Sequence, residues 1–172
     1  MMTFQKFNSF SFLLLAIIAT IFFHGVAAHS PFCEDMNTED LCLSMINGAT
    51  NWHDAVENSI HASLPLAKEL QSKNGLIPPA TAKLSATAKS LLHDTCKKSF
   101  EKVIEMLEGG LVNLAAGENF KLQTRLSLAL DPECSDDLSN SSPTFPLTNL
   151  VKELIAKLTI CVQITAQNVN PE

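Results

Sequence analysis

The sequence is poor in aromatic residues and in charge. Its 172 residues include one Trp, no Tyr and ten Phe, and only 17% carry a charged side chain. Several Phe lie before residue 33, so the rest of the chain must build its core mostly from aliphatic side chains. No basic patch interleaved with aromatics is present, which argues against nucleic acid as a partner. Because hydrophobic residues make up 46% of the chain, we expect a single folded domain rather than a disordered tail.

The sequence also lacks the motifs of common enzymes. It has no phosphate-binding loop, no dinucleotide fingerprint and no Gly-rich nucleophile elbow. Ser90, His93 and Asp94 have the residue types of a nucleophile relay. On a helix, however, Ser90 and Asp94 share a face while His93 points about 100° away from Asp94. We therefore predict no enzymatic activity and no cofactor.

The N-terminal segment has the pattern of a secretory signal peptide. Lys6 is the only charge before an apolar run at residues 10–23, which is short for a membrane span. The small residues Val26-Ala27-Ala28 follow, as a signal peptidase requires. We interpret residues 1–28 as a cleaved signal, with a retained signal anchor as the alternative. No second long apolar run or lipid-anchor signal follows, so we expect the mature domain, residues 29–172, to be secreted and free of the membrane.

All cysteines lie in the mature part, at Cys33, Cys42, Cys96, Cys134 and Cys161. Secretion favours disulfides, and an odd count leaves one thiol over. The sequence alone leaves the connectivity open, but a short hairpin would bring Cys33 and Cys42 together, and Cys96 would then pair with Cys134 across a helical bundle. Cys161 lies on an apolar helical face, so we interpret it as a buried inert thiol. A reactive Cys161 is the alternative.

Apolar residues recur at helical spacing in four segments, and no segment alternates like a strand. The first segment is 51–73, with Pro65 inside it. The second starts at Pro78-Pro79, includes Leu84 and continues through Gly109-Gly110 to Ala116. The third is 119–130 and the last is 147–168. A short helical extension at 30–45 precedes them. This pattern predicts an all-α fold, an up-and-down four-helix bundle with a short N-terminal helical hairpin extension, linked by disulfides.

One group of side chains has the spacing of metal ligands. His53, Glu57 and His61 lie four residues apart, on one face of the first long helix. No fourth ligand is identifiable in the sequence. We interpret the group as a solvated polar face with contacts between residues four apart, and predict no metal site.

The Ser/Pro-rich segment at 139–146 is interpreted as an exposed loop. It contains Asn140-Ser141-Ser142, the only N-glycosylation sequon of the chain. In a secreted protein this makes Asn140 a candidate for glycosylation.

Four stretches occur in a characteristic order along the chain. They are the spacing Cys33-x8-Cys42, the stretch Leu91–Phe100 with Cys96 four residues before its aromatic end, Ser127–Leu130 followed by Cys134 and Asp136, and Ser142–Phe145 followed by Leu147–Leu150. Together, and behind a signal peptide, they resemble the plant invertase/pectin methylesterase inhibitor family. The resemblance covers nearly the whole mature chain.

This resemblance implies a four-helix bundle with an N-terminal hairpin and the bridges Cys33–Cys42 and Cys96–Cys134. It also implies one-to-one inhibition of a plant carbohydrate-active enzyme, and secretion to the cell wall, with the vacuole as the alternative. Invertase inhibitors of the family carry a Pro-Lys-Phe motif where this chain has Gly117–Phe120. Pectin methylesterase is therefore the expected target and acid invertase the alternative. A non-inhibitory scaffold of the same fold is a third interpretation.

The resemblance also indicates where a partner would bind. In pectin methylesterase inhibitors of the family the docking surface involves the second, third and last bundle helices. The matching candidates here are Lys97, Glu101, Glu105, Gln123 and Phe120. The alternative for each is an ordinary solvated helix position.

Overall fold

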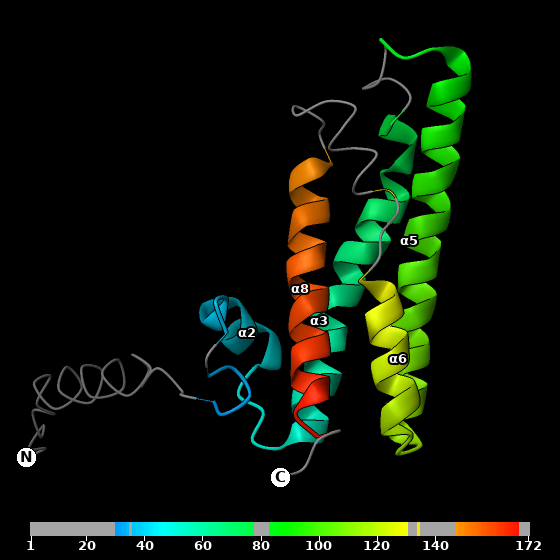
Figure 1. Ribbon diagram of the computed structural model, residues 1–172. Helices are drawn as coiled ribbons and strands as arrows, with labels where there is room; N and C mark the ends of the chain where they lie inside the picture. Colours follow the sequence, from blue (N-terminus) through cyan, green and yellow to red (C-terminus); the bar gives the residue numbers. More distant parts are fainter. Residues whose placement is uncertain (1–29, 35, 78–82, 131–133, 135–146, 169–172) are drawn as a thin grey trace, which may run out of the picture.

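A computed structural model gives the fold of the chain, and it describes residues 30–34, 36–77, 83–130, 134 and 147–168. These residues form α2 (Glu39–Ile46), α3 (Trp52–Ser72), the 3₁₀ turn η1 (Asn74–Leu76), α5 (Ala86–Ala115), α6 (Asn119–Ala129) and α8 (Thr148–Ala166). Helices α3, α5, α6 and α8 run alternately up and down, side by side, while α2 lies outside them (Figure 1). The predicted all-α bundle with a short N-terminal extension is confirmed.

Local signals in the sequence set most helix ends. The Asn51 side chain caps α3 by accepting a hydrogen bond of 2.9 Å from the Asp54 backbone N–H. At the C-terminal end of α2, Asn47 adopts the left-handed conformation with a φ of 48°. Gly117 adopts a positive φ of 70° at the end of α5. Such residues release the chain from the helix at little cost.

Two boundaries of the bundle helices lie two or more residues from their predicted positions. Helix α5 begins at Ala86 rather than at the proline pair, whose residues fall in the stretch 78–82 outside the described residues. The reason is the cap, because Ser85 Oγ accepts a hydrogen bond of 3.2 Å from the Ala88 N–H. Leu84, predicted as part of the helical stripe, lies before the helix, half-buried against the core. The last helix ends at Ala166, two residues before its predicted end.

The N-terminal extension is helical only from Glu39 to Ile46, not from residue 30 as predicted. The described residues before it form turns. A continuous helix would hold Cys33 and Cys42 about 14 Å apart, whereas their Cα atoms are 5.7 Å apart in a disulfide. The chain must therefore turn back before α2. Helix α2 packs on α3 and α8, and Asn58 Nδ2 donates to the Ile46 carbonyl at 2.8 Å.

The core of the bundle is aliphatic, as expected, and Phe100 is its only aromatic side chain among the described residues that is fully buried. In α8 the buried positions include Ile160 and Ile164, while Ile155 and Val162 are half-buried. Helix α8 contacts both α3 and α6, and packing against two neighbours widens the buried face beyond one stripe.

The structure contains two disulfides, the pairs that the sequence analysis expects. The bond between Cys33 and Cys42 joins the two arms of the extension, and the bond between Cys96 and Cys134 ties α5 to the chain after α6. Cys161 is a free thiol and is fully buried, with its Sγ 3.5 Å from Ser63 Oγ. Burial raises the pKa of the Cys161 thiol, which disfavours the reactive thiolate.

Polar contacts also tie α3 to α8 at two points along their interface. Trp52 Nε1, at the start of α3, donates to the Ile164 carbonyl at 2.9 Å. Pro65 lies inside α3 and lacks the N–H that would bond to the carbonyl four residues earlier. At this turn Lys157 Nζ donates to the Ala62 carbonyl at 3.2 Å. Among the described helices, none is long and apolar enough to span a membrane.

Candidate functional site

Two glycines in α5 let α6 pack closely against it. A Cβ atom on Gly109 would lie 2.6 Å from Nη1 of Arg125, and one on Gly110 would lie 3.4 Å from Cδ1 of Leu122. The Arg125 side chain therefore lies across α5 at a position that a larger residue would obstruct. This close packing explains why α5 contains a Gly-Gly pair although glycine lowers helix propensity.

A polar network fastens this helix pair. Asn113, on α5, is buried. Its Oδ1 accepts from Arg125 Nε at 2.8 Å, and its Nδ2 donates to Glu118 Oε2 at 2.7 Å. Lys121 Nζ donates to the other Glu118 oxygen at 2.6 Å. The hydrogen bonds from Lys121 and then Asn113 lower the pKa of Glu118, because they stabilise its charged form.

Beside this network a shallow apolar groove opens between the two helices. We call it the α5–α6 groove, with a volume of about 340 Å³ and a lining of Met106, Phe120, Lys121, Thr124, Arg125 and Leu128. Phe120 is 75% exposed and Leu128 is 49% exposed. Large apolar side chains exposed together in this way are typical of surfaces that bind a partner.

The structure brings the five candidate partner-binding residues together only in part. Lys97, Glu101 and Glu105 are exposed and, at four-residue spacing, share one face of α5. Phe120 lines the α5–α6 groove, whereas Gln123 is half-buried and is not among the residues that line it. Whether any of them binds a partner stays a prediction.

The sequence analysis missed the other apolar residues of the α5–α6 groove, Met106 and Leu128, as well as Arg125. Their spacing is that of ordinary amphipathic helices. One signal was available, the pair Gly109-Gly110 within a strongly periodic helix, because a glycine inside a helix often indicates close packing of a neighbouring element. That signal locates the helix contact but does not reveal the exposed groove next to it.

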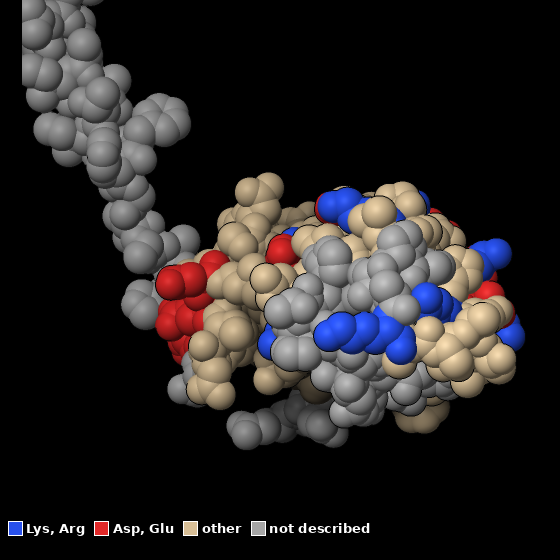
Figure 2. All heavy atoms as spheres, turned by 90° about the horizontal axis from the view of Figure 1, so that it is seen from above, with Lys and Arg blue, Asp and Glu red and all other residues tan. Residues whose placement is uncertain are grey.

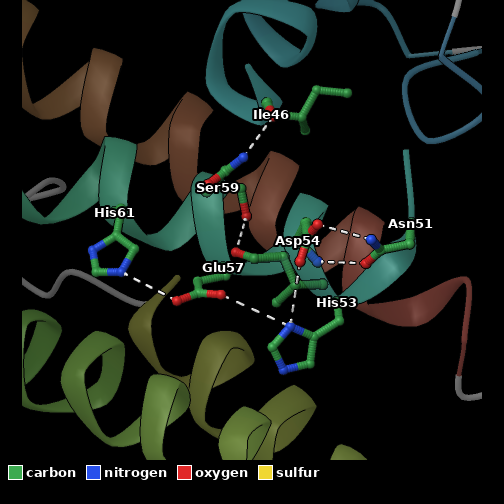
Figure 3. A network of polar contacts seen from close by, with 9 residues as sticks. Ile46, Asn51, His53, Asp54, Glu57, Ser59 and His61 are labelled. Carbon is green, nitrogen blue, oxygen red and sulfur yellow. Dashed lines mark hydrogen bonds and ion pairs between the residues drawn. The ribbon is translucent and has the colours of Figure 1, made fainter. Parts of the chain in front are cut away.

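The side chains weighed as metal ligands lie along the exposed face of α3 (Figure 3). Glu57 lies between the two histidines, with one oxygen 3.8 Å from His53 Nδ1 and the other 3.8 Å from His61 Nε2. These separations are too long for hydrogen bonds. They are contacts between residues four apart on a solvated face, with ion pairing when the histidines are protonated.

The structure also shows how two of the residues weighed as a nucleophile relay lie. His93 Nδ1 lies 3.3 Å from Asp94 Oδ1, a contact that their 100° angular separation did not predict. Side chains of neighbouring exposed residues can bend toward each other, which helical angles alone do not capture. Asn140 falls outside the described residues, as does the proposed signal segment, residues 1–28.

Comparison with known proteins identifies the fold. The chain is similar in structure to a mutant form, form A, of a pectin methylesterase inhibitor from Arabidopsis, with a TM-score of 0.66 and 21% sequence identity over 83% of this chain and 96% of that one. It is also similar to a pectin methylesterase inhibitor from Arabidopsis thaliana, with a TM-score of 0.59 and 21% identity over 81% of this chain and 93% of that one. No model of a known protein family matches the sequence, and no curated protein matches it. The fold is thus that of the pectin methylesterase inhibitor structures.

Proposed function

We propose that the mature chain is a secreted, non-enzymatic inhibitor of plant pectin methylesterase that covers the active-site cleft in a one-to-one complex. The observation that supports this is the fold shared with two pectin methylesterase inhibitor structures over more than four fifths of the chain. Such inhibition needs no bond chemistry, only a rigid surface that excludes the polysaccharide. Two disulfides and an aliphatic core favour that rigidity, which limits the entropy lost on association.

The α5–α6 side of the bundle supplies a suitable surface. Aromatic, Met and Arg side chains are enriched in protein interfaces, and the α5–α6 groove holds one of each, in Phe120, Met106 and Arg125. On the same helix pair, Lys97 and Glu101 are exposed. We propose that the groove forms the centre of the interface and that these charged side chains belong to its polar rim.

Acid invertase is the second candidate target, and one observation favours it. Phe120 is 75% exposed at the start of α6, the segment where invertase inhibitors of the resembling family carry Pro-Lys-Phe. This chain keeps the Phe but has Glu118-Asn119 in place of the other two residues. Pectin methylesterase therefore remains the first proposal. A non-inhibitory scaffold is the third.

The test is a titration of the oxidised mature chain, starting at His29, into a plant pectin methylesterase and a plant acid invertase. Loss of esterase activity that saturates near one inhibitor per enzyme is the expected result. Loss of invertase activity alone would instead establish the second candidate. If the activity of several isoforms of each enzyme is unchanged, the inhibitor proposal is wrong and the scaffold interpretation takes its place.

The proposed location depends on segments outside the described residues. We propose that the chain is cleaved after Ala28, secreted to the cell wall, and glycosylated at Asn140, with a vacuolar destination as the alternative. N-terminal sequencing of the protein purified from plant tissue tests the cleavage, and the mass of the peptide that contains Asn140 tests the glycan. A mature chain that starts at Met1 would contradict the secretion.

A further inference from the structure

A third ligand candidate joins the histidine face of α3 in the folded structure. His53 Nδ1 lies 3.8 Å from Asp54 Oδ1 and 3.8 Å from Glu57 Oε2. One ligand atom from each of the three residues lies within 4.8 Å of the others. The sequence analysis predicted no metal here because it found no further ligand beside His53, Glu57 and His61, and it did not weigh Asp54.

The three atoms have nearly the spacing that a small divalent ion requires. Zinc lies about 2.0–2.2 Å from nitrogen and oxygen ligands, so two tetrahedral ligands are about 3.4 Å apart. The two separations of 3.8 Å from His53 are a few tenths of an ångström wider. All three side chains are about half exposed, so small rotations bring them to bonding distance, and water completes the coordination.

The second oxygen of the Asp54 carboxylate is held by a neighbouring residue. Asn51 Nδ2 donates to Asp54 Oδ2 at 2.8 Å, which leaves Oδ1 directed to His53 (Figure 3). A hydrogen-bonded partner of this kind orients a metal ligand from an outer position. The Glu57 oxygen that faces away from His53 lies 3.8 Å from His61 Nε2, beyond hydrogen-bonding distance, and His61 is not a ligand in this arrangement.

The segment of chain around the site is acidic. Residues 30–67 contain six Asp and Glu and neither Lys nor Arg. Among the described acids, Glu34, Glu39 and Asp40 belong to the extension, and Figure 2 shows acidic side chains gathered on that side of the molecule. The lysine of α8 that reaches α3, Lys157, is engaged by the Ala62 carbonyl. The partial positive charge at the start of α3 opposes a cation, so the two carboxylates must supply most of the attraction.

We propose that His53 Nδ1, Asp54 Oδ1 and Glu57 Oε2 form a surface site for one divalent ion of the zinc class. The mixture of one imidazole and two carboxylates suits zinc better than calcium or magnesium, which prefer oxygen ligands alone. With only three protein ligands, all about half exposed, the site should bind more weakly than a buried four-ligand structural site. Binding requires neutral His53 and weakens as the histidine is protonated. This site does not depend on the proposed inhibition.

The test is calorimetric titration of the oxidised mature chain with zinc chloride near neutral pH, together with ¹H–¹⁵N spectra that resolve the histidine ring nitrogens. We expect one saturable site, a shift of His53 Nδ1, and at least tenfold weaker binding in His53→Ala and in Asp54→Asn. His61→Ala should change the affinity less than about threefold, because His61 is not a ligand and makes no hydrogen bond to Glu57. His93→Ala is the matched control, since His93 contacts a single carboxylate, that of Asp94.

Far-ultraviolet circular dichroism of each variant without metal shows whether α3 remains folded, so a folding defect is not mistaken for ligand loss. The proposal is overturned by a wild-type chain that shows no saturable binding up to millimolar zinc. It is also overturned if folded His53→Ala binds as tightly as the wild type, or if His61→Ala or His93→Ala loses binding as fully as His53→Ala.

Discussion

The α3–α8 and α5–α6 interfaces of this bundle are built in different ways. Helices α3 and α8 bury aliphatic side chains such as Ile60 and Leu158 completely, and enclose a free thiol, Cys161. Helices α5 and α6 meet over two glycines and a buried asparagine, and they leave Phe120 and Leu128 exposed at the surface.

The lengths of the helices explain the difference. Helix α6 has 11 residues against 30 in α5, so it covers only part of its neighbour and its own outer face stays open. The α3–α8 pair has 21 and 19 residues and can close along its length. One side of the bundle therefore contributes mostly stability, and the other keeps apolar surface available to a partner.

The largest effect should come from a core truncation in the closed interface. Leu158→Ala removes a fully buried side chain of α8 and should lower the free energy of unfolding by about 2–5 kcal/mol. Its matched control is Leu128→Ala at the α5–α6 groove, where half the side chain is already in water, and which should cost less than about 1 kcal/mol. Urea denaturation of the oxidised proteins measures both. Equal losses would show that the two interfaces do not differ as described.

The next effect concerns binding rather than folding. Phe120→Ala should weaken inhibition of the target enzyme by about thirtyfold or more, as expected for an aromatic at the centre of an interface, while stability stays nearly unchanged. Leu91→Ala is the control, since Leu91 is 67% exposed on α5 but does not line the groove. The measurement is the inhibition constant of each variant. Equal constants would show that the α5–α6 groove is not part of the interface.

The third-largest effect should come from the loss of a buried hydrogen-bonding side chain. Asn113→Ala leaves Arg125 and Glu118 without their shared partner and should cost about 1–3 kcal/mol. In the closed interface, Ser63→Ala removes a hydroxyl that bonds only to the Ser59 carbonyl of its own helix and to the Cys161 thiol, and should cost less. Thermal unfolding of the two variants gives the comparison. A larger loss for Ser63→Ala would mean that the polar network does not fasten the α5–α6 pair.

The smallest effect is a pH dependence of the open interface. Folding lowers the pKa of Glu118 below its ordinary value of 4.5, so its contribution is fully present above that value and is lost as the pH falls through the lower folded pKa. The stability difference between wild type and Glu118→Gln should therefore be constant near neutral pH and shrink in the acid range. Denaturation curves between about pH 3 and pH 7 test this. A difference that does not change with pH would show that Glu118 gains nothing from its partners.

Much of the architecture was accessible from the residues themselves. Periodic apolar positions revealed all four long helices, and Asn51 and Gly117 indicated two of their ends, because capping depends on hydrogen bonds within a few residues. The start of α5 was misplaced because Pro78-Pro79 and Ser85 are both good helix starts, and a local rule cannot choose between them. The cysteine spacing and the neighbouring motifs indicated the family resemblance and the disulfide pairing.

The surface features depended on the tertiary structure. Helical spacing shows which face of α6 is apolar, but how much of α5 that face covers depends on the length and register of both helices in space. In the same way, the approach of Asp54 to His53 depends on side-chain rotamers. The sequence by itself determined the helices and their polarity, since these follow from short-range periodicity, whereas the disulfide pairs were implied by the family resemblance and are seen only in the folded structure. Only the tertiary structure decided that the α5–α6 groove stays open, because its lining side chains come from two helices that must be positioned in space, and that His53, Asp54 and Glu57 approach one another on α3, because this depends on their rotamers.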